Sequence, residues 1–266
     1  TVAILAQVAL FPVAEKMDPS QAVKVRFDEG RHPRAKIGIL LVATDQSVEG
    51  DWVRATPAGV GVHFARVPFP NEITVETLSA QKDVMASAAE SVIHGEQLDV
   101  VCYACTAGSV VVGEEAVFEA LQRGRPEARP TCIITGAIHG LRAFAARRIV
   151  VCTPNIDEIN LLEKGYLEKA GFEVLSIHGF QLRKDTEIAR VAPEFLEEFV
   201  AAVDQPLAEA VFISCTGMRS LEVLDALERR LRKPVLCSNQ VMIWRCLRLA
   251  GVRDPIEGCG RLLREF

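Results

Sequence analysis

The sequence predicts an α/β protein built from two pseudo-symmetric lobes, each a parallel sheet flanked by helices, with an active-site cleft between them. Two observations carry this prediction. Short apolar runs rich in β-branched residues alternate with amphipathic segments from residue 36 to residue 251, which favours parallel sheets with right-handed crossovers. The alternation also restarts halfway: the 68 positions from Ile37 to Cys105 match the 66 positions from Ile149 to Cys215.

This repeat sets the expected domain boundaries. Residues 1–35 are expected to form an N-terminal arm, polar and charged over its second half. Residues 36–140 are assigned to lobe 1 and residues 141–239 to lobe 2. The C-terminal segment 240–266 is expected to pack back on lobe 1.

The strands are recognised as apolar runs that end in small or polar residues. The run from Lys36 to Ala43 has no polar residue after its first, so it reads as a fully buried strand. The run from Val60 to Val67 alternates between apolar and polar residues, as a half-buried strand does. The expected strands are 36–43, 60–67, 98–104, 131–135, 147–152, 172–177, 210–214 and 234–238.

The helices are recognised by apolar residues that recur at helical spacing. Segment 77–94 carries Leu78, Met85, Ala89 and Val92 on one face. Segment 158–170 stops before Gly171, a residue suited to the position after a helix end. The expected helices are 49–56, 77–94, 110–122, 137–146, 158–170, 193–203, 221–231 and 240–250.

Composition excludes several classes of function. The chain has 266 residues, of which 49% are hydrophobic, so it can bury an ample core. A net charge of −5 and an aromatic content of 6% give no reason to expect a nucleic-acid partner. No apolar run approaches the length of a membrane span, so no membrane partner is expected. A small carboxylate is the expected ligand, because the backbone N–H groups and the Thr and Ser hydroxyls that follow the apolar strands suit one. Assembly as a homo-oligomer is compatible with the composition.

The eight cysteines do not form the pattern of a secreted disulfide scaffold. Five lie in or at the end of apolar runs, which indicates a reducing cytoplasm. Cys102 and Cys105 have the spacing of a redox pair, but Cys102 falls inside a predicted strand. Because no second cysteine pair completes a metal site, no metal is expected.

Two cysteines stand out by their position in the repeat. Cys105 and Cys215 each end an apolar strand and open a turn of small residues that leads towards a predicted helix. Ligands of open α/β sheets gather at these carboxyl ends. Backbone N–H groups and a helix N-terminus are expected to lower the pKa of each thiol and favour the thiolate. The alternative, that both are ordinary buried core cysteines, is less consistent with two matching contexts.

These residues also carry a resemblance to a known family. Tyr103-Ala104-Cys105-Thr106-Ala107-Gly108-Ser109, Ile213-Ser214-Cys215-Thr216 and the segment 233–240 resemble the aspartate/glutamate racemase superfamily. The likeness is to its branch of maleate isomerases, arylmalonate decarboxylases and ectoine-utilisation EutA proteins, with EutA the most similar. It covers most of residues 36–251 and implies two α/β lobes, catalytic cysteines in the cleft, and no metal or cofactor.

The chain departs from this branch at two loops. Maleate isomerases carry Asn where this chain has Asp45, and most of the branch carries Tyr where this chain has Asn155. An added carboxylate disfavours a plain dicarboxylate but suits a substrate that bears an ammonium group. We therefore expect an amino-acid-like or ectoine-derived substrate. Both cysteines are present, whereas arylmalonate decarboxylases keep one, which places the chain nearer the racemases and isomerases.

Four functions follow as hypotheses. The first is a racemase or isomerase in which Cys105 and Cys215 act as acid and base. The second is a maleate-type cis–trans isomerase with a covalent cysteine adduct. The others are an arylmalonate-type decarboxylase and a non-catalytic small-carboxylate binding protein. The charged loop 184–187 either covers the cleft or is simply solvated. The predicted substrate-binding residues are Thr44, Asp45, Thr106, Gly108, Ser109, Thr153, Asn155, Thr216, Gly217 and Asn239.

Overall fold

The computed structural model describes residues 25–266. The expected arm therefore lies largely outside the described residues, and its described part, 25–34, contains no helix or strand. The chain divides after Gly30, and residues 31–266 form one unit that holds both sheets. Within residues 25–266, no helix is both long enough and apolar enough to cross a membrane.

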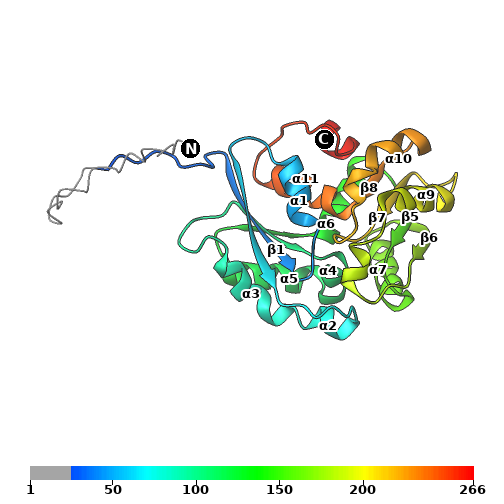
Figure 1. Ribbon diagram of the computed structural model, residues 1–266, viewed down its shortest axis with the longest axis horizontal. Helices are drawn as coiled ribbons and strands as arrows, with labels where there is room; N and C mark the ends of the chain where they lie inside the picture. The colour runs from blue at the N-terminus through cyan, green and yellow to red at the C-terminus, as the bar shows by residue number, and fades with distance from the viewer. Residues whose placement is uncertain (1–24) are drawn as a thin grey trace, which may run out of the picture. The chain divides into compact units, whose positions relative to one another are not determined.

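Two four-stranded parallel sheets confirm the predicted fold class (Figure 1). The first has the order β2-β1-β3-β4 and the second the order β6-β5-β7-β8, so corresponding strands of the two halves occupy corresponding places. This identity of order also confirms the repeat inferred from the sequence. The strands are β1 (Ala35–Val42), β2 (Val60–Val67), β3 (Val100–Ala104), β4 (Arg129–Cys132), β5 (Arg148–Thr153), β6 (Glu173–Gly179), β7 (Ala210–Ile213) and β8 (Val235–Cys237).

The order of the strands determines where ligands can bind. In the first sheet the chain passes from β1 to β2 on one side and then to β3 on the other side of β1. The second sheet does the same around β5, so the strand order reverses between β1 and β3 and between β5 and β7. The loops after these two strands diverge, which opens a crevice at their carboxyl ends. Cys105 follows β3 and Cys215 follows β7, so each cysteine lies at such a crevice.

Helices connect the strands and cover the sheets. The helices of the first half are α1 (Val48–Ala55), α2 (Val75–Ser79), α3 (Lys82–Ser91), α4 (Thr106–Val112), α5 (Glu114–Gly124) and α6 (Ile133–Ala143). Those of the second half are α7 (Asp157–Lys169), α8 (Asp185–Ile188), α9 (Pro193–Val203), the 3₁₀ helix η1 (Ser220–Glu222), α10 (Leu224–Leu231), α11 (Ser238–Leu249) and α12 (Arg261–Glu265).

Three predicted helices are each divided in two: 77–94, 110–122 and 221–231, the last into η1 and α10 on either side of Val223. The segment 110–122 breaks at Gly113, whose φ of +86° is outside the helical region. The segment 77–94 tightens around Gln81, whose N–H donates to the carbonyl of Leu78 three residues back. This local turn directs the buried Gln81 side chain at Tyr103, whose hydroxyl donates to it at 2.6 Å. Periodicity alone does not reveal such breaks.

Shorter elements differ from expectation at their ends. The strand expected at 131–135 stops at Cys132, and α6 begins at Ile133, four residues before the predicted start. Helices α8 and α12 were not predicted. Both have only four or five residues, too few for a periodic pattern to be visible.

Helices α6 and α11 pack together between the two halves. Helix α11 follows the last strand of the second sheet, yet it contacts α6, α1, β3 and β4 of the first half. The close approach depends on glycine: a Cβ added at Gly136 of α6 would lie 2.9 Å from the Val241 carbonyl oxygen of α11. This backbone contact sets the distance between the two halves.

We predict that Gly136→Ala destabilises the protein by about 1–3 kcal/mol, because backbone rather than a flexible side chain must move to admit the methyl group. Gly165→Ala is the matched control: it lies within α7 with nothing near its added Cβ, and should stabilise by about 0.5–1 kcal/mol. Urea unfolding of the two variants measures both effects, and equal stability of Gly136→Ala and the parent would contradict the first.

Candidate active site

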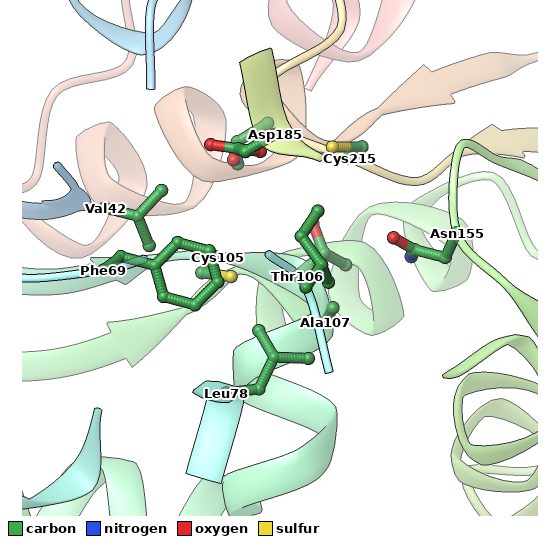
Figure 2. Close-up of a pocket in the computed structure, with 11 residues that line it drawn as sticks. Val42, Phe69, Leu78, Cys105, Thr106, Ala107, Asn155, Asp185 and Cys215 are labelled. Atoms are coloured by element: carbon green, nitrogen blue, oxygen red, sulfur yellow. The ribbon is translucent and has the colours of Figure 1, made fainter. Parts of the chain in front are cut away.

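A single cavity collects loops from both halves of the molecule (Figure 2). Its lining comes from the carboxyl ends of β1, β3, β5 and β7 and from the segments that follow β2 and β6. Cys105 and Cys215 both line it, from opposite halves, as the repeat predicts. The lining residues are Val42, Phe69, Ile73, Leu78, Cys105, Thr106, Ala107, Asn155, Asp185, Cys215 and Thr216.

The cavity is narrow. It offers about 30 Å³ to the centres of water molecules. One water needs about 10–15 Å³ on this measure, so the space admits only a small ligand. In Figure 2, Asp185 lies on the Cys215 side, Cys105 and the apolar side chains lie on the facing side, and Asn155 points in from the far end.

Cys105 is held at the start of α4. It is the N-cap residue, and its Sγ accepts a hydrogen bond from the Gly108 N–H at 3.3 Å. A Cβ added at Gly108 would lie 2.2 Å from the Tyr103 hydroxyl and 3.1 Å from the Cys105 Sγ. Gly108 is therefore required for the chain to pass close behind the thiol.

Cys215 lies in a different local structure, although its Sγ also accepts a hydrogen bond, from the Gly217 N–H at 3.3 Å. No helix begins at Cys215: an irregular loop continues until η1 begins at Ser220. The expected helix N-terminus is thus present at Cys105 only. Both thiols follow corresponding strands and both accept a hydrogen bond from a backbone N–H, but only Cys105 caps a helix.

The prediction that the local structure lowers both thiol pKa values is wrong. Burial, together with the nearby Asp185 and Asp45, raises the pKa of Cys105 to about 12, although hydrogen bonds from the Gly108 N–H and Tyr103 oppose the shift. Burial and Asp185 likewise raise the pKa of Cys215 well above its usual range. One N–H donor does not offset desolvation combined with two carboxylates.

Asp185 is the carboxylate within the cavity. It is 8% exposed and accepts a hydrogen bond from the Thr44 hydroxyl across the two halves. Burial raises its pKa, which the Thr44 hydroxyl partly opposes. Asp185 belongs to the charged loop 184–187, and its place in the lining agrees with the alternative that this loop covers the cleft.

Asp45 lies behind the cavity rather than in its lining. Its Oδ1 accepts hydrogen bonds from the backbone N–H groups of Ser47 and Val48, at the start of α1. Its Oδ2 is buried and has no hydrogen-bond partner among the described residues. Burial raises the pKa of Asp45 to about 6. Asp45 therefore acts on the site through its charge.

Asn239 also supports the site from behind. Its amide donates to the Asp51 carboxylate at 2.6 Å and to the Thr216 carbonyl at 3.0 Å. The second bond holds the loop that carries Cys215. Asp51, which the sequence analysis did not single out, joins the two halves through this contact, and burial raises its pKa to about 6.

The remaining predicted residues divide between lining and support. Thr106, Asn155 and Thr216 line the cavity. Ser109 donates to the Cys105 carbonyl, and Thr153 donates to Asn160 and accepts from the Asn155 N–H. These two side chains therefore fix loops rather than face the cavity. The sequence reasoning missed four apolar lining residues, Val42, Phe69, Ile73 and Leu78, which carry no chemical signal.

Two segments from different halves are tied together beside the cavity. The Asn71 carbonyl accepts from the Asp185 N–H, and the Asn71 side chain accepts from the Thr186 N–H. The Ile73 N–H donates to the Arg183 carbonyl at 2.8 Å. We call these paired segments, 71–74 and 183–186, the strap. The strap holds Asp185 in place although no regular strand precedes it directly.

This architecture defines a class: an α/β protein of two similar halves that each contribute one cysteine to a shared cavity. Its family follows from comparison. The chain belongs to the arylmalonate decarboxylase family, whose sequence pattern matches residues 86–263. Membership confirms the predicted enzyme and the branch of maleate isomerases and arylmalonate decarboxylases. The closer likeness to EutA and an ectoine-derived substrate remain predictions.

Individual relatives agree with this placement. A maleate isomerase of Nocardia farcinica is 29% identical over 63% of this chain and 70% of its own length. An arylmalonate decarboxylase of Bordetella bronchiseptica is 31% identical over 51% of this chain and 58% of its own. The fold is similar to a solved structure of the Nocardia farcinica maleate cis–trans isomerase, a cysteine-to-serine mutant with a covalently bound succinylcysteine intermediate. That match has a TM-score of 0.80 and 24% identity, and covers 87% of this chain and 99% of that one.

We predict that iodoacetamide modifies Cys105 and Cys215 selectively, because these two thiols are partly exposed and the other six are buried. The rate at Cys105 should rise about tenfold per pH unit up to pH 10, since its pKa is about 12 and the thiolate reacts. Peptide mass mapping measures both, with Cys105→Ser and Cys215→Ser assigning the sites. A rate plateau near pH 7 would contradict the raised pKa.

We also predict that Asp51→Asn stabilises the protein at pH 8. Asp51 is protonated in the folded state up to about pH 6 but ionises near pH 4 when unfolded, so stability falls as pH rises between these values. Asparagine keeps the oxygen that accepts from Asn239 but does not ionise. The variant should therefore be more stable to unfolding than the parent by about 1–2 kcal/mol at pH 8 and equally stable at pH 4. Thermal unfolding at both pH values measures it. The exposed control Glu119→Gln should show no such trend.

Proposed function

We propose that this protein is a cofactor-independent isomerase or racemase in which Cys105 and Cys215 act as acid and base on a small carboxylate. The observation that carries the proposal is the arrangement of the thiols: they follow equivalent strands of two similar halves and line one cavity from opposite halves. Two groups on opposite faces of a substrate are what a racemase needs, since one removes a proton while the other delivers one.

The proton transfers balance without a co-reactant. One thiolate takes the α-proton, the C–H electron pair moves into the carboxylate to give an enediolate, and the opposite thiol protonates the other face. The enediolate needs donors in place before it forms. The side chains of Asn155, Thr106 and Thr216 line the cavity and are suited to that role.

Charge within the site supports an amino-acid-like substrate, such as an ectoine-derived compound. Asp185 faces the cavity and Asp45 lies close behind it, so a ligand with a cationic group is favoured over a dianion. The motif likeness to EutA points in the same direction.

A covalent cis–trans isomerase is the second candidate. The relatives named maleate isomerase support it, as does the succinylcysteine intermediate of the Nocardia enzyme. In that reaction a thiolate adds to the alkene, the new single bond rotates, and the thiolate leaves again. The carboxylates beside the cavity disfavour maleate itself as the substrate here.

The two remaining alternatives have less support. Arylmalonate decarboxylation is supported by the family name, but the presence of both cysteines favours chemistry that uses two faces. A non-catalytic binder of small carboxylates would not need a cysteine from each half in the cavity. Such a binder predicts thiol alkylation that ligands do not slow.

The test is turnover of small carboxylates in deuterium oxide, followed by NMR. A two-base enzyme should introduce deuterium at the α-carbon, and Cys105→Ser or Cys215→Ser should lower kcat by at least about a hundredfold. A covalent isomerase would instead add the substrate mass to one cysteine without α-deuterium. Turnover and exchange that survive Cys105→Ser would refute the proposal, and the buried Cys246→Ser is a control for thiol loss outside the site.

A further inference from the structure

The cavity has an uneven distribution of charge. Asp185 is the carboxylate in its lining, and no lysine, arginine or histidine of residues 25–266 lines it. The nearby Arg66 is already engaged by the carbonyls of Ala43 and Asp45 and by the Glu49 carboxylate. Arg219 donates to the Val191 carbonyl. A ligand with two carboxylates would therefore meet a carboxylate and no cation.

The Asp185 carboxylate has capacity for a ligand. One of its oxygens accepts from the Thr44 hydroxyl, and the other has no hydrogen bond to a described residue. Its backbone N–H is fixed to Asn71 through the strap, so the carboxylate is held in position rather than free to turn to solvent. A buried, positioned carboxylate without a cation is stabilised when a ligand supplies one.

Within residues 25–266, the other sides of the cavity carry no carboxylate and differ in this from the side formed by Asp185. Asn155 presents its side-chain amide from the far end of the cavity, away from Asp185 (Figure 2). Its amide N–H can donate to a carboxylate, as can the Thr216 hydroxyl. Four apolar side chains also line the cavity and offer no partner to a second polar group: Val42, Phe69, Ile73 and Leu78.

We propose that the cavity selects a small zwitterionic amino acid with one carboxylate and an apolar side chain, and that Asp185 binds its ammonium group. The carboxylate of the amino acid lies towards Asn155 and Thr216, and its apolar side chain lies against the four apolar lining residues. The inference rests on the proposed function for its chemistry, but the selectivity of binding is measurable without turnover.

The same arrangement links substrate binding to the reactivity of the cysteines. Asp185 is the largest electrostatic contribution that raises the pKa of Cys215, and it also raises that of Cys105. An ammonium group beside Asp185 offsets this charge, so thiolate forms more readily when an amino acid is bound. A carboxylate without an ammonium group would not have this effect.

The sharpest probes are 2-aminobutyrate and butyrate, which differ in one ammonium group. Calorimetry with the full chain should give a Kd for 2-aminobutyrate at least about tenfold lower than for butyrate, and lower than for maleate. Asp185→Asn should bring the ratio of the first two Kd values close to one. Glu187→Gln, on the same short helix but exposed, is the matched control and should leave the ratio unchanged.

Each result decides the inference. Equal or tighter binding of butyrate or maleate by the parent protein overturns it, and this measurement does not depend on the folding of any variant. A ratio that survives in a folded Asp185→Asn overturns the role of Asp185. Selective binding of 2-aminobutyrate without α-deuterium exchange would refute the proposed chemistry and leave the recognition intact. α-Deuterium exchange on dicarboxylates alone would support the proposed chemistry and refute the selective recognition of an amino acid.

Discussion

The packing of α6 against α11 is the contact on which the rest of the structure depends. Each helix follows the last strand of its own sheet, and each crosses to the other half. Gly136 lets the two backbones meet, so the halves are held at a fixed separation with the carboxyl ends of their strands around one cavity. Contacts such as Asn239 with Asp51 then fix the orientation of individual loops.

The site combines two features that oppose each other. The cavity is narrow and leaves little room for water, which strengthens the action of every charge within it. The same narrow site places two thiols near carboxylates, which together with burial raises the pKa of both thiols. A ligand that brings positive charge relieves this opposition, whereas a dianion increases it. Chemical selectivity and the activation of sulfur therefore share one electrostatic cause.

Much of the fold and part of the site could be predicted from the sequence. The two sheets and the cysteine in each half follow from apolar runs and their spacing, which are local signals. The broken helices at Gln81 and Gly113 depend on tertiary contact and on one φ angle, which periodicity does not report. Asp185 was missed because its place in the cavity is set by hydrogen bonds to residues more than a hundred positions away. The raised thiol pKa values depend on burial, which local sequence does not reveal.

The strap has a consequence for how such a site can change during evolution. Asp185 is positioned by backbone bonds to Asn71, in a loop of the other half, and not by the strands that carry the cysteines. Lengthening or shortening the 68–74 loop would shift the carboxylate while both sulfur atoms stayed where the sheets hold them. Preference for a new compound can thus be acquired through a surface insertion, and the reactive pair is inherited unchanged.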